Sequence, residues 1–301
     1  MLAPKRLTVS AFLFMSPLVL FGAGGFLGQH VLRLLSERGE EVVCLGRQAV
    51  PQAAFHTCDV RDVARVTELL DSLEPGRILN CASVASLAGC FEDPEQARSV
   101  NSDFLRVLGE WCAKSAARVV HVSTDMVFAG EAPSGGYVED SVAQPASEYG
   151  ASKLAGEEAL LAADPRALVV RLPLLFGDSF GRGLGASDSI LAAVASGEQP
   201  GLFTDEWRTP LAVRDAAAAL LELCEGESRG VLHLAGGERV TRFELGELVL
   251  AAHGLPADSI RASQRSEAQA SEPRPRDLSL NSELARAKLN CELRGPRSFF
   301  A

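Results

Sequence analysis

The feature that most constrains the fold is a glycine-rich turn between an apolar run and a helix-period segment. The turn reads GAGGFLG over residues 22–28 and follows SPLVLF (16–21), which predicts a core strand. Gly22 permits a tight turn, Gly25 lets the backbone approach a pyrophosphate, and Gly28 allows the helix to pack closely on the strand. A glycine turn without a ligand is the alternative. The residues of this turn that we expect at a dinucleotide are Gly22, Gly25, Phe26, Leu27 and Gly28.

Short apolar runs rich in Val, Ile and Leu alternate with helix-period segments along most of the chain. Helices are expected over 26–38, 63–73, 95–116, 148–163 and 212–225. This alternation predicts right-handed βαβ crossovers and an α/β fold of the Rossmann type, with a doubly wound parallel sheet. The expected strands are 17–21, 41–46, 53–57, 77–82, 117–123, 167–176 and 230–236.

The alternation weakens after residue 177, where GDSFGRGLGASDS (177–189) predicts a loop. We expect a dinucleotide-binding domain over 15–176 that is completed by about 212–236. The remaining segments predict a smaller C-terminal lobe that binds substrate, and residues 1–14 form an extension that the sequence does not explain. The segments of the lobe are 177–211 and 237–301.

Composition excludes several classes of protein. With 29 basic and 39 acidic residues, the net charge of −10 argues against a nucleic-acid partner. The seven cysteines form no C-x-x-C pair and the five histidines are scattered, so we expect no metal site and a reducing, cytoplasmic location. The apolar stretch at 11–21 resembles a secretory leader, but cleavage after it would remove the first strand. Pro17 and the glycines argue against a membrane span.

The second expected strand ends in CLGRQ (44–48), about twenty residues after the glycine turn, where dinucleotide folds select their cofactor. An acidic residue there would bind the ribose 2′-hydroxyl of NAD, whereas an arginine accommodates a 2′-phosphate. Arg47 has no acid beside it, so we expect NADPH, with NADH as the alternative. Asp59 and Val60, after the third strand, are expected at the adenine edge. A helix N-cap is the other interpretation of Asp59.

Tyr149 and Lys153 open a helix with a spacing that places them on one face. An ammonium near a phenol would lower the pKa of Tyr149 from about 10, which suits a general acid/base. A surface pair is the alternative for this spacing. The motif VVHVSTD (119–125) strengthens the catalytic interpretation because it ends a strand with hydroxyl-bearing residues, among them Thr124.

Together these motifs resemble the extended short-chain dehydrogenase/reductase family. HVSTDMVFAG (121–130), EYGASKLAGE (148–157) and VVRLPLLFG (169–177) are similar, more narrowly, to the dTDP-4-dehydrorhamnose reductases and other sugar-nucleotide enzymes. The resemblance implies that Thr124 binds the substrate oxygen, Tyr149 transfers the proton and Lys153 holds the nicotinamide ribose. It also implies that Asn101 supports the site and that three residues pass along the cofactor: Cys81, Ala82 and Ser83.

The same resemblance implies a substrate site, in which planar guanidinium groups would bind nucleotide phosphates. The family's aromatic residue after Ser-Thr-Asp is replaced by Met126, and SLAGC (86–90) lacks the family's charges, so the reaction is better defined than the sugar. For Trp207, Arg208 and Arg276 an ordinary surface position is the alternative. The implied substrate residues are Ser123, Met126, Trp207, Arg208 and Arg276.

These observations predict an NAD(P)H-dependent reductase of a nucleotide-linked 4-keto-6-deoxysugar, of the kind used in dTDP-rhamnose biosynthesis. An epimerase or dehydratase of the same fold is one alternative. Another is a non-catalytic, NADP-binding regulatory subunit that resembles the beta subunit of methionine adenosyltransferase. The expected partner is the nucleotide sugar, without nucleic acid or membrane, and a homodimer is compatible with the resemblance.

Overall fold

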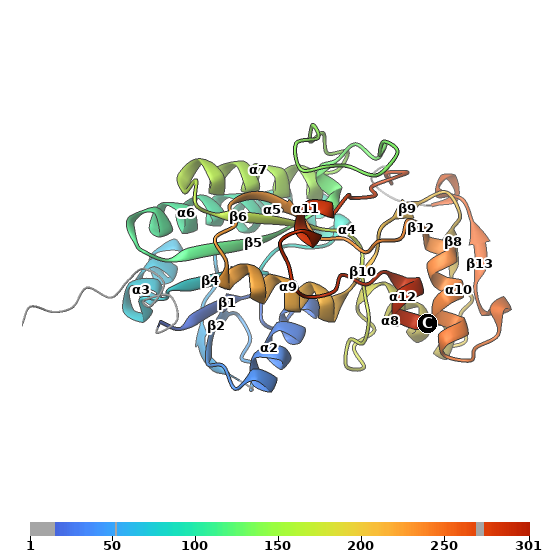
Figure 1. Cartoon of the computed structure of the whole chain (residues 1–301), viewed down its shortest axis with the longest axis horizontal. Coiled ribbons are helices and arrows are strands. Elements are labelled where there is room, and N and C mark those ends of the chain that lie inside the picture. The colour runs from blue at the N-terminus through green and yellow to red at the C-terminus, as the bar shows by residue number, and fades with distance from the viewer. Residues whose placement is uncertain (1–15, 52, 269–273) are drawn as a thin grey trace, which may run out of the picture.

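The computed structural model describes residues 16–51, 53–268 and 274–301, so the extension expected over 1–14 lies outside the described residues. Seven parallel strands form one sheet in the order β11-β6-β5-β4-β1-β2-β3 (Figure 1). This confirms the predicted doubly wound α/β fold. The strands of the sheet are β1 (Leu18–Phe21), β2 (Val42–Gly46), β3 (Ala54–Thr57), β4 (Arg77–Asn80), β5 (Arg118–Thr124), β6 (Leu168–Leu172) and β11 (Gly230–His233).

The strand order reverses at β1, which pairs with β2 on one side and with β4 on the other. Phe21 at the carboxyl end of β1 is in register with Asn80 at the end of β4. In an open parallel sheet, a crevice forms where the connections leave in opposite directions, and ligands bind there. The fold therefore places a crevice beside the glycine turn.

Helices cover both faces of the sheet, and alternate residues of β1 face each layer. Leu18 and Leu20 pack under α2 and α9, whereas Val19 and Phe21 pack under the opposite layer. The expected helix over 95–116 divides into α5 and α6, with a π-helical turn between them at Ser99–Asp103. The helices of the two layers and their ends are α2 (Phe26–Arg38), α3 (Val63–Leu73), α4 (Leu87–Glu92), α5 (Pro94–Arg98), α6 (Phe104–Lys114), α7 (Glu148–Ala163) and α9 (Val213–Glu225).

A smaller group of elements lies beyond the carboxyl ends of the strands, at the right of Figure 1. The expected strand over 167–176 is interrupted at Pro173, which has no N–H for a ladder bond, and continues as β7. The loop expected over 177–189 is shorter, because α8 begins at Gly185. The elements of this group are β7 (Leu175–Phe176), α8 (Gly185–Ala195), β8 (Gly201–Phe203), β9 (Trp207–Arg208), β10 (Leu211–Ala212), β12 (Val240–Thr241), α10 (Arg242–Ala252), β13 (Arg261–Ser263) and α12 (Pro296–Phe300).

Part of the C-terminal segment packs on the sheet layer instead. Ala285 of α11 (Glu283–Arg286) and Leu293 are buried in the same cluster as α2 and α9. The segment expected to form the lobe therefore also contributes to the core of the sheet. Over the ranges that the structure describes, there is no helix with the length and apolar character needed to span a bilayer.

Candidate active site

A cleft of about 330 Å³ opens at the carboxyl ends of β1, β2 and β4. It collects residues from the glycine turn, from the end of β2, from the segment after β3 and from the loop after β4. Eight of the residues predicted to bind the cofactor line it: Gly22, Gly25, Arg47, Asp59, Val60, Cys81, Ala82 and Ser83.

The glycine turn has the geometry that its spacing predicts. Gly22 has a φ of +80°, and a Cβ there would stand 2.6 Å from the backbone of Cys81. A Cβ at Gly28 would collide with the carbonyl of Gly22, so this position serves packing of α2 on β1. A Cβ added at Gly24 would have no neighbouring atom within 4 Å. The turn thus needs two of its glycines for its own structure and keeps open space on the cleft side.

The N-terminus of α2 fits the pyrophosphate of a dinucleotide. Gly25 is its N-cap and supplies no side-chain acceptor, and the first turn contains no acidic residue. Its N–H groups and the helix dipole therefore favour an anion. Two of the predicted residues do not line the cleft. Leu27 is buried in the core, and Phe26 lines a different cavity.

Two arginines stand where the cleft meets the end of β2. Arg61 holds the Asp59 carboxylate through Nε and Nη2, at 3.0 and 2.7 Å, and lowers the pKa of Asp59 to about 2. Arg47 makes no hydrogen bond or ion pair with a described residue and acts on Asp59 only through its charge. The N-cap of α3 is Asp62, which accepts from Arg65 N at 3.0 Å, so the alternative N-cap role for Asp59 was wrong. Sequence reasoning did not single out Arg61.

A second cavity, of about 410 Å³, lies between the end of β5, the start of α7 and the C-terminal elements. Thr124 is the last residue of β5, and Tyr149 lies in the first turn of α7, which Ser147 caps by accepting from Gly150 N at 3.1 Å. Besides Phe26, four residues predicted for catalysis or substrate binding line this cavity together: Thr124, Met126, Tyr149 and Arg208.

The phenol of Tyr149 is protonated at neutral pH. Burial raises the pKa of Tyr149 to about 12, and the hydrogen bond with Thr124 opposes this only in part. The expectation that Lys153 would lower this pKa was wrong, because the lysine Nζ donates to Val122 O at 2.7 Å and lies 3.1 Å from His121 Nε2. The arrangement supplies a proton donor rather than a phenolate.

Lys153 is buried to 1% exposure between α7 and the sheet. Burial lowers the pKa of Lys153 from 10.5 to about 8, while the charge of Glu157 opposes the shift. The ammonium is therefore much easier to deprotonate than a lysine in water. Lys153 lines neither cavity directly but lies behind Tyr149, one helical turn further along α7.

Asn101 fixes the loop after β4 against α7. Its Oδ1 accepts from Val84 N at 2.9 Å, and its Nδ2 donates to Val84 O and to Ser152 Oγ, both at 3.0 Å. These bonds come from the π-helical turn between α5 and α6, a feature that often marks functional segments. Asn101 thus supports the wall that separates the two cavities.

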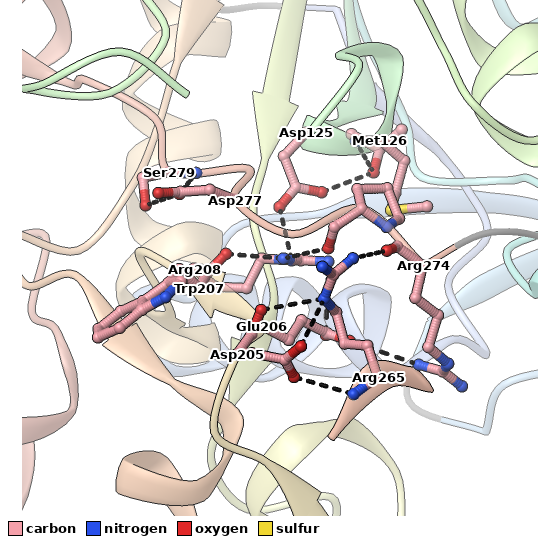
Figure 2. A network of polar contacts seen from close by, with 12 residues as sticks. Asp125, Met126, Asp205, Glu206, Trp207, Arg208, Arg265, Arg274, Asp277 and Ser279 are labelled. Atoms are coloured by element: carbon pink, nitrogen blue, oxygen red, sulfur yellow. Dashed lines mark hydrogen bonds and ion pairs between the residues drawn. The ribbon is translucent and has the colours of Figure 1, made fainter. Parts of the chain in front are cut away.

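The far wall of the second cavity is a cluster of opposite charges (Figure 2). Arg208 lies between Asp125 and Glu206, with nitrogen–oxygen distances of 3.7 and 3.4 Å. Burial raises the pKa of Asp125 to about 6, although Arg208 opposes the shift. Asp125 Oδ2 and Glu206 Oε2 accept no hydrogen bond from any residue that the structure describes. The residues of this wall that the sequence did not single out are Asp125, Glu206, Arg242 and Arg274.

Three predicted substrate residues do not line the cavity. Ser123 donates its hydroxyl to Glu157 on the opposite side of β5. The guanidinium carbon of Arg239 lies over the indole of Trp207, 3.8 Å from the centre of the ring. Arg276 Nη2 pairs with Oε2 of the exposed Glu131 at 3.2 Å. The cationic position that the sequence assigned to Arg276 is occupied by Arg274, two residues earlier. Within the described part of the chain no three His, Cys, Asp or Glu side chains cluster as metal ligands.

Comparison with known proteins identifies the family. The model of the RmlD substrate binding domain matches residues 15–298. The chain belongs to the RmlD substrate binding domain family. This confirms the resemblance inferred from the motifs. A probable low-salt glycan biosynthesis reductase of Haloferax volcanii is 34% identical over 277 residues, which cover 90% of this chain and 91% of that protein.

Other relatives of this RmlD-family chain carry different names. A dTDP-4-dehydrorhamnose reductase of Mycobacterium tuberculosis is 33% identical, with 86% of this chain and 82% of that protein covered. A methionine adenosyltransferase 2 subunit beta of Xenopus laevis is 30% identical, with 80% and 73% covered. Among solved structures, a hypothetical dTDP-4-dehydrorhamnose reductase from Sulfolobus tokodaii has a TM-score of 0.82 at 29% identity, covering 92% of this chain and 96% of that one.

Proposed function

We propose that this protein is a reductase that transfers hydride from NADPH to the keto group of a nucleotide-linked 4-keto-6-deoxysugar. The observation that carries the proposal is the second cavity, where a protonated Tyr149 and the Thr124 hydroxyl face a wall that contains three arginines, Arg208, Arg242 and Arg274. Relatives over most of the chain, named as dTDP-4-dehydrorhamnose reductase and dTDP-4-keto-6-deoxy-D-glucose reductase, support the same reaction.

The proton chemistry follows from the two hydroxyl groups. Bound NADPH would supply the hydride. Thr124 and Tyr149 would hydrogen-bond the carbonyl oxygen, and Tyr149 would then give its proton to that oxygen as negative charge develops there. A phenol with a pKa of about 12 remains protonated at working pH and still is a stronger acid than the alcohol that forms. Lys153 lies one turn behind, as the nearest buried amine.

The cofactor would lie in the cleft beside the glycine turn. The N-terminus of α2 would receive the pyrophosphate, and the guanidinium of Arg47 would bind the 2′-phosphate that distinguishes NADPH from NADH. A family structure from Bacillus anthracis, 20% identical with a TM-score of 0.83, was solved in complex with NADP. The likeness to that structure concerns the fold, and the choice of cofactor rests on Arg47.

The substrate would place its diphosphate on the arginine wall and its sugar beside Tyr149. Guanidinium groups bind phosphate oxygens through charge-assisted hydrogen bonds, and in a protein with an overall charge of −10 a group of three arginines at one cavity is distinctive. The sugar end of the cavity is apolar and includes Met126, Leu87 and Leu174. These side chains suit the C6 methyl group of a deoxysugar, and Met126 cannot supply the hydrogen bond of a phenol.

The test is NADPH oxidation by the purified protein with nucleotide-linked 4-keto-6-deoxysugars, and with the same keto sugars lacking the nucleotide. We expect turnover with at least one nucleotide-linked sugar and at least tenfold lower kcat/KM without the nucleotide. Equal efficiency with simple ketones would contradict the substrate class. Tight NADPH binding without reduction of any sugar would contradict the enzyme assignment and favour a regulatory subunit, as the name of the Xenopus relative suggests.

A further inference from the structure

A continuous line of hydrogen bonds runs behind the proposed catalytic tyrosine, from the loop after β4 to α7. Ala82 N lies 3.0 Å from Asn80 Oδ1, and Asn80 Nδ2 lies 3.0 Å from His121 Nδ1. The other ring nitrogen, His121 Nε2, lies 3.1 Å from Lys153 Nζ, which also donates to Val122 O at 2.7 Å. Asn80, His121 and Lys153 are all at most 1% exposed, so these three side chains are shielded from bulk water.

The direction of each bond follows from the first donor. A backbone N–H can only donate, so Asn80 must present Oδ1 to Ala82 and its NH₂ group to the histidine ring. His121 Nδ1 therefore accepts, and the single proton of the neutral ring lies on Nε2. That proton points at Lys153 Nζ.

A donor aimed at Lys153 distinguishes the two protonation states of the lysine. A neutral amine has a lone pair that accepts the His121 proton, whereas an ammonium has three donors and no acceptor. With the ammonium, two donors would face each other across 3.1 Å at an almost fully buried position. The line of bonds thus stabilises the amine.

The surrounding groups do not supply a free counter-charge for the ammonium. The nearest carboxylate on α7, Glu157, is already paired with Arg171 and accepts from Ser123. Cys81 faces the same space, and burial raises the pKa of its thiol to about 12, which keeps it neutral. Cys90 also acts on Lys153, and its thiol donates to Val84 O. On the side of His121, the facing groups are Lys153, the Asn80 side chain and the Asn80 backbone, whose hydrogen bond partly opposes the lowering of the His121 pKa by burial.

We propose that His121, oriented by Asn80, is a positioning residue that stabilises the amine form of Lys153 left after the lysine returns a proton to Tyr149. This role rests on the proposed reductase function. In reduction, the phenol O–H breaks and the product O–H forms, leaving a phenolate. The Lys153 N–H then breaks and the phenol O–H forms again. The resulting amine accepts the His121 Nε2–H bond, His121 keeps its proton throughout, and water reprotonates Lys153.

One near-isosteric substitution reverses the line of bonds. In Asn80→Asp, one carboxylate oxygen still accepts from Ala82 N, but the other can only accept from the ring. The His121 proton must then move to Nδ1, and Nε2 becomes an acceptor for the Lys153 ammonium. We expect the pKa of Lys153 to rise by at least about one unit, which is a tenfold change in its proton affinity.

The first experiment needs neither substrate nor variant. Long-range proton–nitrogen spectra of the nitrogen-15-labelled protein report the tautomer of each of the five histidines. The His121 ring is assigned by correlating its signals with those of its own backbone. We expect His121 to carry its proton on Nε2 at every pH from about 6 to 9. A proton on Nδ1, or an imidazolium in that range, would overturn the proposal. This result is independent of which sugar, if any, the protein reduces.

The second experiment tests whether the change in the pKa of Lys153 in Asn80→Asp acts through the His121 ring or only through the added negative charge. The nitrogen-15 shift of Lys153 Nζ is titrated in the wild type, in Asn80→Asp, and in Asn80→Asp combined with His121→Phe. We expect the upward shift only when the ring is present, together with a tenfold or greater fall in kcat and an unchanged KM for the sugar nucleotide. An equal shift without the ring would show that the added carboxylate acts alone, and the positioning role of His121 would be rejected.

Discussion

Two buried charges one turn apart on α7 have opposite surroundings. Glu157 and Lys153 are 2% and 1% exposed. Glu157 binds the guanidinium of Arg171 through both oxygens, at 2.7 and 3.1 Å, and accepts from Ser123. Lys153 instead contacts a carbonyl and a neutral ring. Among the described residues, Glu157 has an ion partner and Lys153 has none.

The comparison distinguishes charges that hold the fold from charges held for chemistry. Removing one member of a buried ion pair leaves the other unpaired, which destabilises a protein strongly. A buried charge without a counter-ion instead shifts its pKa toward the neutral form, as the pKa of Lys153 does, to about 8. Such a group exchanges protons easily in the working range of an enzyme. Whether a buried charge on α7 stabilises the fold or exchanges protons therefore depends on its counter-ion more than on its position along the helix.

The largest expected effect is the loss of stability when Glu157, and not Lys153, is replaced. Glu157→Gln should lower the free energy of unfolding by about 3–5 kcal/mol, because Arg171 loses its partner in the core. Lys153→Met should leave the stability equal or higher, since an apolar side chain of similar size needs no solvation. Urea unfolding of both variants at neutral pH measures the difference. A larger loss in Lys153→Met than in Glu157→Gln would contradict the assignment of roles.

A second pair of charges tests the substrate cavity. Arg274 lines the cavity, whereas Arg276 pairs with the exposed Glu131 outside it. Arg274→Ala should raise KM for the sugar nucleotide about ten- to a hundredfold, the effect of a lost charge-assisted phosphate bond worth about 1.5–3 kcal/mol. Arg276→Ala is the matched control and should change KM less than about threefold. Steady-state kinetics decide, and equal KM values for the two variants would remove Arg274 from the site.

A third pair concerns the cofactor cleft. Arg61 is bound to Asp59, whereas the guanidinium of Arg47 has no hydrogen-bond or ion-pair partner among the described residues. Arg47→Asp should reverse the order of affinity for NADPH and NADH, with a loss of about ten- to a hundredfold for NADPH. Arg106→Asp on the exposed face of α6 makes the same change of charge away from the cleft and should leave both dissociation constants unaltered. Calorimetry that finds equal dissociation constants for both cofactors in the wild type would refute the role of Arg47.

The smallest expected effect is a pH dependence of stability. Because the pKa of Lys153 falls from 10.5 to about 8 on folding, the unfolded chain binds more protons between these values. Stability from this group therefore rises with pH across that window, and Lys153→Met should lose the rise. The slopes of the two proteins should differ by about 1 kcal/mol per pH unit. Parallel slopes in urea unfolding would mean that Lys153 titrates normally.

Features set by neighbouring residues could be predicted from the sequence. The turn at 22–28 follows from glycine spacing, and the helix that begins at Glu148 follows from a capping serine and the residues after it. Thr124 could be found because it ends β5, and Tyr149 because it lies in the first turn of α7. The parallel order of the strands followed from their alternation with helices.

Features that depend on partners distant in the sequence could not be predicted. Arg171 and Glu157 are held together by the packing of α7 on the sheet, which also turns Ser123 away from the cavity. In the C-terminal segment, Arg274 lines the cavity whereas Arg276 pairs with Glu131 outside it, and the sequence alone does not tell these two arginines apart. The pKa of Tyr149 depends on burial, which spacing alone does not report.

The central claim is that α7 presents a neutral tyrosine as the proton donor for reduction. Single-turnover and steady-state kinetics of Tyr149→Phe with NADPH and the best nucleotide-linked keto sugar test it most directly. The account predicts a fall in kcat of about 10²–10⁴-fold, the usual scale for a lost general acid, with the fold and NADPH binding retained. Turnover within a few fold of the wild type would contradict the account, because no other proton donor has been assigned to that oxygen.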